Sequence, residues 1–293
     1  MTVMRKKTLG RTGLQVSPIA LGGAVFGYEN RTHDWNPWSS QGRSLAIQAI
    51  HHAIDRGLNY IDTAPLYGDG NSESIVGEVM RTRRGECVLA TKVWFEKDRK
   101  GVIESVHDSL KRLQTDYIDI VQVHGRMYDQ AYYKHIVDGG PLAGLNELKA
   151  QGKIGFIGLT SEEPWSCLQF LPHREIDLYQ IAYNFIYQAA ARHFLIDATK
   201  ADAAIVTMRT MTSGVMQRIA SYIAPEWQGA HDLYDVSLKF VLSDSRVHSA
   251  IIGMRWPEEV ERNIQTVENW VPPFDLATLP RLTGEIYKTE DAG

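Results

Sequence analysis

The 293-residue sequence is poor in cysteine and has no excess of charge of one sign. Its two cysteines, Cys87 and Cys167, lie far apart and form no CxxC pair, which excludes a zinc ribbon or a thioredoxin-type motif. Two thiols in a chain of this length are typical of a reducing compartment, so we expect a cytoplasmic protein. The net charge of −4, with both signs mixed along the chain, argues against nucleic-acid and membrane-surface partners.

Long apolar runs and several well-known motifs are also absent. No stretch approaches the roughly 20 apolar residues that cross a bilayer. No apolar segment follows the basic N-terminal residues, as it would in a signal peptide. The sequence contains no GxGxxG, P-loop, HExxH or GxSxG motif. The adjacent pair His51-His52 lies in a segment of amphipathic helical spacing, so we expect a helix face there and no metal site.

What the sequence does contain is a recurring strand–helix unit. Short apolar runs, typical of strands covered on both faces, alternate with segments of helical spacing. The predicted strands span residues 18–23, 58–62, 87–91, 117–123, 154–159, 178–183, 203–208 and 248–252. The predicted helices span about 44–56, 72–83, 101–113, 142–151, 163–171, 188–201, 231–243 and 257–268.

Eight such units predict parallel strands that close into a (β/α)8 TIM barrel, a single domain over residues 1–293 with no separate cofactor domain. Residues 7–16 predict a small N-terminal β-hairpin. Residues 27–42 predict a long surface loop at the mouth of a site. A short polar C-terminal tail is predicted to carry one last helix near 276–288. An open doubly wound sheet is the alternative, although its glycine fingerprint is missing after the first strand.

Four reactive side chains follow three consecutive predicted strands. Asp62 ends the second strand and Tyr67 lies five residues later, while Lys92 and His124 follow the third and fourth strands. Because the C-terminal strand ends of such a barrel form its site, we expect these side chains around one opening. The set suits proton donation to a carbonyl oxygen.

We assign each of the four an expected role. The Lys92 ammonium, held by Asp62, is expected to lower the pKa of the Tyr67 phenol. His124 is expected to hydrogen-bond the substrate oxygen and to share the proton. None of these groups supplies electrons, so the site requires a cofactor.

At this point the sequence resembles the aldo-keto reductase family. The matching motifs are Asp62-Thr-Ala-Pro-Leu-Tyr-Gly68 with Ser72-Glu73, Thr91-Lys92, Gln122-Val-His124, and the segments 9–18, 152–158, 180–184 and 251–263. The resemblance covers nearly the whole chain. It implies a barrel plugged at the bottom by the hairpin. It also implies hydride transfer from a nicotinamide cofactor to an aldehyde or ketone, with Tyr67 as general acid assisted by Asp62, Lys92 and His124.

The resemblance further implies a cofactor that lies extended along the barrel rim. The implied cofactor-binding residues are Gly23; Thr160, Ser161 and Gln180 for the carboxamide; Met208, Arg209, Thr210, Met211, Ser213 and Gly214 for the pyrophosphate; and Gly253, Arg255, Glu259 and Asn263 for the adenosine end. Arg255 and Arg209 favour NADP(H), since a guanidinium pairs well with a 2′-phosphate. Glu259 opposes that phosphate, so NAD(H) is the alternative. Thr160-Ser161 stands where the family has Ser-Asn, which removes an amide donor.

Two other functions stay open at this stage. One is a nicotinamide-binding regulatory or scaffold protein of the same fold with vestigial catalysis. The other is an aldolase that forms a Schiff base on Lys92. For the enzyme reading the partner is a small-molecule carbonyl substrate, and the oligomeric state is left open. Aromatic residues suggest an apolar-walled substrate pocket: Trp35 and Trp38 in the first loop, and Trp94, Phe95, Tyr128, Tyr132 and Tyr133 in later loops.

Overall fold

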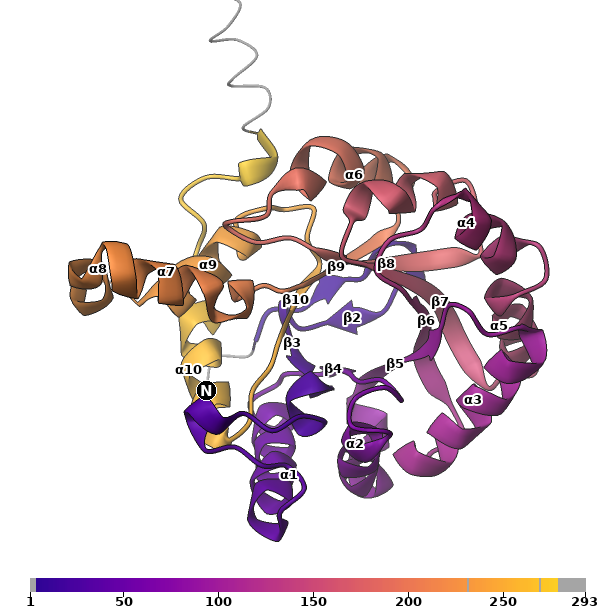
Figure 1. Cartoon of the computed structure of the whole chain (residues 1–293), viewed down its shortest axis with the longest axis horizontal. Helices are drawn as coiled ribbons and strands as arrows, with labels where there is room; N and C mark the ends of the chain where they lie inside the picture. The colour runs from indigo at the N-terminus through magenta and orange to yellow at the C-terminus, as the bar shows by residue number, and fades with distance from the viewer. Residues whose placement is uncertain (1–3, 231, 269, 279–293) are drawn as a thin grey trace, which may run out of the picture.

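The computed structural model describes residues 4–230, 232–268 and 270–278. Eight parallel strands close into a barrel ringed by helices (Figure 1), which confirms the predicted (β/α)8 fold. Around the barrel the order is β10-β3-β4-β5-β6-β7-β8-β9. The strands are β3 (Ile19–Gly22), β4 (Tyr60–Asp62), β5 (Val88–Trp94), β6 (Ile118–His124), β7 (Ile154–Ser161), β8 (Ile176–Ala182), β9 (Ala204–Met208) and β10 (Ser249–Ile252).

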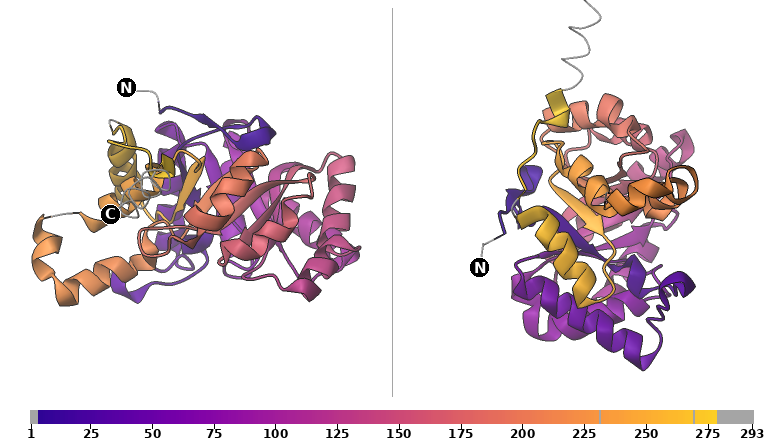
Figure 2. Two further views of the ribbon diagram at one scale, coloured as in Figure 1. Left: turned by 90° about the horizontal axis from the view of Figure 1, so that it is seen from above. Right: turned by 90° about the vertical axis from the view of Figure 1, so that its left-hand side faces the viewer.

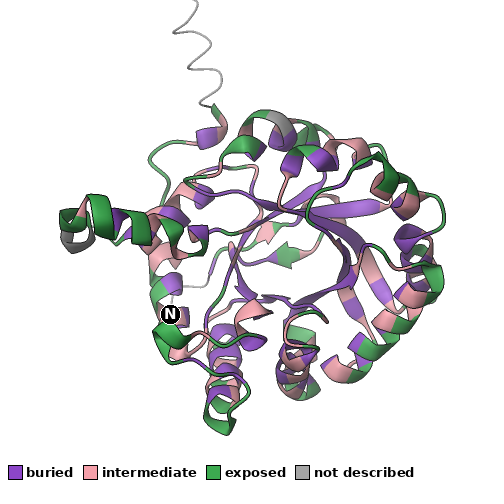
Figure 3. Cartoon of the chain, in the orientation of Figure 1, coloured by how far each residue is buried: buried purple, intermediate pink, exposed green. Residues whose placement is uncertain are grey.

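The helices cover the outer face of the barrel. Barrel strands are buried along most of their length, and exposed residues gather on the outward sides of the helices (Figure 3). The α-helices are α1 (Ser40–Asp55), α2 (Asn71–Arg83), α3 (Arg99–Leu113), α4 (Gln130–Val137), α5 (Pro141–Ala150), α6 (Ala189–Lys200), α7 (Val215–Ile223), α8 (Pro225–Ala230), α9 (Leu233–Leu242) and α10 (Pro257–Glu268). None of the helices described is both long and apolar enough to span a membrane.

The N-terminal hairpin closes one end of the barrel, as predicted. Its arms β1 (Lys7–Thr8) and β2 (Gln15–Val16) pair antiparallel around a short 3-10 turn. Leu9 and Val16 are fully buried and pack with inward-facing strand residues. Arg11 in the turn donates hydrogen bonds to the carbonyls of Ile176, where β8 begins, and Ala201. The hairpin therefore lies at the N-terminal strand ends, opposite the loops that carry the predicted site (Figure 2).

The first long loop is shorter than predicted. Helix α1 begins at Ser40 rather than near residue 44, because the Ser39 side chain accepts a hydrogen bond from the Gly42 amide and caps the helix. The first turn of α1 contains no apolar residue, so the apolar spacing that predicted the helix begins only after its first turn. Trp35 is not at the surface: it is 3% exposed, and its indole N–H donates to the Val25 carbonyl at 2.6 Å.

Other elements also differ from the prediction. Residues 163–171, expected to be an α-helix, form the 3-10 helix Pro164–Phe170, which starts on a proline. Helix α4 was expected to be loop, although Asp129 gives a capping signal by accepting from the Tyr132 amide. Helices α7 and α8 were missed as well. Of the helix expected near 276–288, Leu276–Thr278 is a 3-10 turn and the remainder lies outside the described residues.

The hairpin plug yields a stability prediction. Truncating Leu9 to alanine leaves a cavity in the inner cluster, so we expect Leu9→Ala to lower the free energy of unfolding by about 3 kcal/mol. Leu14→Ala, at a half-buried hairpin position, is the control and should cost less. Denaturant unfolding measures both. Equal losses for the two variants would contradict a specific plugging role for Leu9.

Candidate active site

A buried ion pair lies at the C-terminal end of β4 and β5. The Lys92 ammonium donates to both carboxylate oxygens of Asp62, at 2.8 and 2.7 Å, and to the Thr63 carbonyl at 2.8 Å. Asp62 accepts a further hydrogen bond at 3.0 Å from the side-chain amide of Gln122 on β6. All three protons of the ammonium are therefore engaged, and the carboxylate is fixed from two strands.

A second polar network, centred on the buried carboxylate of Glu73, lies on the outer side of β5. Glu73, in the first turn of α2, accepts from the hydroxyl of Thr91 at 2.6 Å and pairs with Arg112 of α3 at 2.6 Å. Thr91 directly precedes Lys92, so its side chain faces outward where the lysine faces inward. This anchor fixes β5 against α2 and thereby holds the lysine in place.

The loop that carries Tyr67 is held by a close approach of two backbone turns. Gly68 has a φ of +62° and touches Gly27, and a Cβ atom at either glycine would collide with the backbone of the other turn. The Tyr28 hydroxyl also donates to the Leu66 carbonyl at 2.8 Å. The loop therefore presents Tyr67 in one defined position above the ion pair.

Tyr67 and His124 lie together at the ion pair. The Lys92 ammonium is 4.9 Å from the centre of the Tyr67 ring. The rings of Tyr67 and His124 meet edge to face at 5.9 Å, and Trp94 packs against His124 at the same distance. The structure thus brings all four predicted catalytic side chains into one cluster. The Nδ1 atom of His124 is buried and has no hydrogen-bond partner among the described residues.

Burial and the lysine charge determine the protonation of this cluster. Burial lowers the pKa of Lys92, but the charges of Asp62 and Tyr67 and the hydrogen bonds to them together outweigh it and raise that pKa above its ordinary value. Burial raises the pKa of Tyr67; Lys92 opposes this without overcoming it, and Asp62 adds to it. Lys92 thus acts on the phenol in the predicted direction, but burial, which the sequence does not reveal, outweighs it and leaves the pKa of Tyr67 raised.

The imidazole of His124 is neutral at physiological pH. Burial, followed by the charges of Lys92 and Arg126, lowers the pKa of His124 to about 3. A neutral imidazole keeps one N–H donor and one acceptor nitrogen. The cluster thus offers a protonated phenol and a neutral imidazole side by side, and both can donate a hydrogen bond to one oxygen atom.

These groups open into a cavity of about 980 Å³ that runs across the C-terminal strand ends. Most of the predicted site residues line it, from the cluster of Tyr67 and His124 at one side to α10 at the other. The lining includes Asp62, Tyr67, His124, Thr160, Gln180, Met208, Arg209, Thr210, Met211, Ser213, Gly214, Gly253, Arg255, Glu259 and Asn263.

Three predicted site residues do not line the cavity. Lys92 lies beneath it, 1% exposed. Gly23 packs against Ser72 and the Asp62 carbonyl, where a Cβ atom would collide with both. The hydroxyl of Ser161 is turned away from the cavity and donates to the Arg126 carbonyl at 2.6 Å. Gly23 and Ser161 therefore support neighbouring backbone rather than face the cavity.

Arginines at the far end of the cavity are paired with carboxylates. The Arg255 guanidinium and amide donate to the two oxygens of Glu259, at 2.5 and 2.7 Å. Arg209 pairs with Glu162 and also donates to the Ser213 hydroxyl. Arg262 pairs with Asp232. Glu259, which the sequence predicted to oppose a bound phosphate by its charge, thus forms a direct ion pair with Arg255.

The predicted aromatic wall is only partly present. Trp94 lines the cavity, and Tyr28 and Leu66 stand beside it. Phe95 and Tyr128 are instead buried in the core behind the site. Tyr132 and Tyr133 pack on Phe95 and Phe170, and Trp35 and Trp38 are not among the lining residues.

Several site residues escaped the sequence analysis. Gln122 carried a signal, because residues two apart on a strand share a face and His124 was already assigned to the interior. Arg126 and Glu162 lie in loops, where no periodicity marks the direction of a side chain, and Arg218 lies on α7, a helix that the sequence analysis did not predict.

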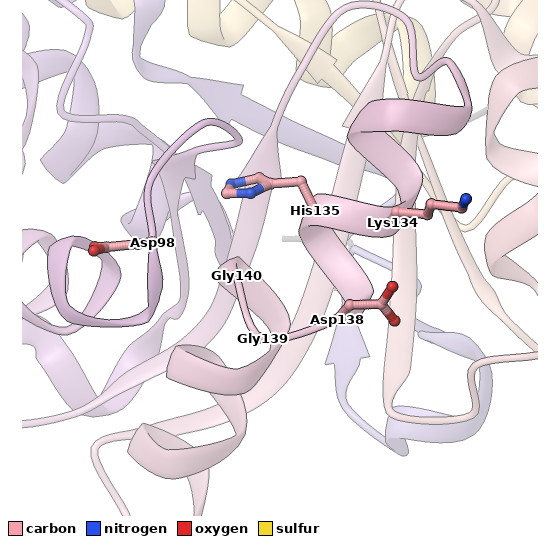
Figure 4. Close-up of a pocket in the computed structure, with 6 residues that line it drawn as sticks. All are labelled: Asp98, Lys134, His135, Asp138, Gly139 and Gly140. Atoms are coloured by element: carbon pink, nitrogen blue, oxygen red, sulfur yellow. The ribbon is translucent and has the colours of Figure 1, made fainter.

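A second, smaller hollow of about 440 Å³ lies outside the barrel, between the start of α3 and the turn from α4 to α5 (Figure 4). Its polar groups serve local structure: Asp98 caps α3, and His135 hydrogen-bonds the Lys97 carbonyl. Lys134 points away from both. No group of three metal-binding side chains occurs in the part of the chain that the structure describes. The cavity at the strand ends is thus the stronger candidate site.

Comparison with known proteins gives a consistent match. The model of the aldo/keto reductase family matches residues 18–281. Pyridoxal 4-dehydrogenase from Microbacterium luteolum is 27% identical over 94% of this chain and 96% of its own length. The NADH-specific methylglyoxal reductase of Escherichia coli is 32% identical over 66% of this chain and 63% of its own length.

Solved structures have the same fold. The structure of PA4992 from Pseudomonas aeruginosa has a TM-score of 0.73 and 26% identity, and the match covers 91% of this chain and 96% of that one. An aldo-keto reductase from Klebsiella pneumoniae in complex with NADPH has a TM-score of 0.76 and 23% identity, over 96% and 95% of the two chains.

The buried ion pair predicts a pH-dependent loss of stability. In Lys92→Met the Asp62 carboxylate loses its counter-ion, so we expect a destabilisation of about 3–5 kcal/mol at neutral pH. Burial raises the pKa of Asp62, and a raised folded-state pKa favours the protonated folded form. The loss should therefore shrink as the pH falls towards about 4.

Urea unfolding at neutral and mildly acidic pH measures this effect. The double variant Lys92→Met with Asp62→Asn is the matched control, and it should recover part of the stability at neutral pH because no buried charge remains. A destabilisation that does not change with pH would contradict the uncompensated carboxylate as its cause.

Proposed function

Because the chain belongs to the aldo/keto reductase family, whose relatives here include oxidoreductases, we propose that it is a carbonyl reductase that prefers NADPH. It reduces a small-molecule aldehyde or ketone, and its location is the cytoplasm, in keeping with two free, buried thiols. The observation that carries the proposal is the cluster of Tyr67, His124, Lys92 and Asp62 at one wall of the large cavity.

The cavity fits an extended nicotinamide cofactor. The side-chain oxygen of Gln180 is buried and has no hydrogen-bond partner among the described residues, so it is free to accept from a carboxamide. Thr160 lines the same part of the cavity, while Ser161 acts indirectly through the Arg126 loop. When bound, the cofactor supplies the hydride that adds to the carbonyl carbon.

The loop from β9 and the start of α10 would hold the rest of the cofactor. Met208, Thr210, Met211 and Ser213 line the cavity between the catalytic cluster and α10. Gly253 and Asn263 line its far end, close to the pair of Arg255 and Glu259.

Tyr67 acts as the general acid in this proposal. Its raised pKa keeps the phenol protonated at neutral pH, so the proton is present when a carbonyl oxygen gains negative charge. The Lys92 ammonium, 4.9 Å from the ring, stabilises the phenolate left after transfer. Asp62 keeps the ammonium charged and oriented.

His124 orients the substrate without taking part as an acid. With a pKa of about 3 it is neutral over the physiological range and can donate one hydrogen bond to the carbonyl oxygen. Its edge-to-face contact with Tyr67 directs both donors towards the same region. Together they fix the oxygen beside the phenol.

The contacts of Lys92 argue against an aldolase. A Schiff-base lysine needs a neutral amine with a free lone pair. Here the ammonium donates to Asp62 and Thr63, and its pKa is raised rather than lowered. A scaffold protein of the same fold would not require a complete proton-donating cluster, so turnover assays separate it from the enzyme.

The cofactor's 2′-phosphate would meet a cation that is already paired. Arg255 can pair with that phosphate only in competition with Glu259. The Klebsiella pneumoniae structure holds NADPH, while the Escherichia coli relative is named for NADH specificity. NADP(H) is the preferred cofactor in this proposal, and NAD(H) is the alternative.

The general-acid role predicts the behaviour of Tyr67→Phe. This variant keeps the ring and its packing but loses the proton, so we expect turnover of an aldehyde to fall by at least about 100-fold. Cofactor binding, followed by NADPH fluorescence titration, should change less than twofold. Tyr117→Phe, which removes a phenol hydroxyl that does not line the cavity, is the matched control. Wild-type turnover in Tyr67→Phe would refute Tyr67 as the acid.

The paired guanidinium predicts the effect of Glu259→Gln. Removing the carboxylate frees Arg255 for the 2′-phosphate, so the preference for NADPH over NADH should rise about tenfold in kcat/KM, the value of one charge-assisted hydrogen bond. Glu258→Gln removes the same charge one residue away and is the control. An unchanged preference would show that Arg255 does not meet the phosphate.

A further inference from the structure

Arg126 is a cation in the catalytic half of the cavity that has no carboxylate partner. It follows His124 by two residues, lines the same cavity and is exposed. Among the described residues, no carboxylate lies within ion-pair distance of its guanidinium, and that group makes no hydrogen bond. It is therefore available to a ligand.

The other charges of the cavity wall are largely satisfied. Arg209, Arg255 and Arg262 are each paired with a carboxylate. The acids that line the cavity are satisfied as well, since Asp62 pairs with Lys92, and Glu162 and Glu259 pair with two of these arginines. Arg126 thus stands out as surplus positive charge beside the catalytic cluster.

A second surplus cation, Arg218, lies elsewhere. It is on α7, next to the β9 loop that we assign to the cofactor's phosphates. A charge in that place has an anion to meet in the proposed cofactor complex. Arg126 lies on the loop after β6, away from the proposed position of the cofactor's phosphates. An anion that pairs with it is therefore expected on the substrate.

The backbone around Arg126 is fixed. Its carbonyl accepts from the Ser161 hydroxyl at 2.6 Å and from the Glu162 amide at 2.9 Å. The preceding Gly125 packs against Tyr128, where a Cβ atom would collide with the phenol oxygen. The guanidinium therefore starts from a rigid point beside His124, and only its own side chain has to be ordered on binding.

The remaining wall of this half is mostly apolar. Trp94 packs edge to face on His124, and Tyr28 and Leu66 line the opposite loop. A flat or apolar body fits between them, with one polar anchor at its end. This arrangement of apolar walls with few convergent polar groups is typical of small-molecule sites.

We propose that Arg126 binds a carboxylate on the carbonyl substrate, so that the enzyme reduces aldehydes or ketones with an apolar body and a terminal carboxylate. The inference rests on the proposed reductase function and names its substrate class. A guanidinium can pair with a carboxylate through two parallel hydrogen bonds, which fixes orientation as well as adding affinity. The carbonyl at the other end of the substrate then lies at Tyr67 and His124.

The test compares two aromatic aldehydes whose para group is either an anionic carboxylate or its neutral methyl ester, which makes the aldehyde intrinsically more reactive. 4-Carboxybenzaldehyde and methyl 4-formylbenzoate share the ring and the aldehyde, but the ester is neutral. In the wild type we expect kcat/KM for the acid to exceed that for the ester by about tenfold or more. Arg126→Gln should abolish this advantage while changing kcat/KM for the ester less than twofold.

Two further variants act as controls. Arg126→Lys keeps the charge but loses the planar fork, and it should retain an intermediate preference for the acid. Arg81→Gln removes an exposed arginine from the outside of α2 and should leave the preference at the wild-type value. If the wild type reduces both aldehydes with equal kcat/KM, or if the preference is unchanged in Arg126→Gln, the proposal is overturned.

A binding measurement separates this inference from the proposed function. The alcohol 4-(hydroxymethyl)benzoate is titrated calorimetrically into the wild type and Arg126→Gln in the presence of NADPH, where no reaction occurs. Binding that weakens about tenfold in the variant supports the carboxylate site, even if neither aldehyde is reduced and the reductase assignment fails. Equal affinity, or no binding to the wild type, overturns it.

Discussion

The pairing of Lys92 with Asp62 is the interaction on which the site depends. Each charge is almost fully removed from water, which costs several kcal/mol per ion. Two ion-pair hydrogen bonds, the Thr63 carbonyl and the Gln122 amide offset that cost, and they do so only if β4, β5 and β6 keep their register. The network of Glu73 and the closed barrel fix that register. The charged state of Lys92 and Asp62 therefore depends on the fold as a whole.

The pair also influences the protonation states of the two neighbouring side chains, Tyr67 and His124. Because its own charges largely cancel, Tyr67 experiences burial more than attraction, and its phenol stays protonated. His124 experiences burial and the nearest positive charges, and it stays neutral. Two hydrogen-bond donors without net charge therefore face the cavity. An oxygen that becomes negative during reaction would be the first unbalanced charge in this region, and the cluster would stabilise it more than the neutral carbonyl.

The sequence predicted the elements whose signals are local. Strand ends could be located because apolar runs stop there, and the positions of Asp62, Tyr67, Lys92 and His124 in one cluster followed from those ends. Helices α4 and α7 were missed because they are short, with 8 and 9 residues, and are additional to the one helix that the alternation predicts after each strand. The raised pKa of Tyr67 could not be predicted, because the depth of its burial depends on loops from other strands. The orientation of Ser161 could not be predicted, since it depends on the backbone of a loop 35 residues away.

The charges around the cavity show how one barrel rim can separate two kinds of recognition. Arg255 is already held in one conformation by its carboxylate partner. Because a phosphate must displace that carboxylate before it gains the full interaction, Arg255 discriminates weakly between NADPH and NADH. An arginine without a carboxylate partner loses only bound water when an anion binds. Arg126 therefore discriminates more strongly between anionic and neutral substrates. If both act as proposed, selectivity in this protein lies on the substrate side of the cavity more than on the cofactor side. The relative selectivity for substrate and for cofactor is then set by which guanidinium groups are paired with carboxylates, and not by how many arginines line the cavity.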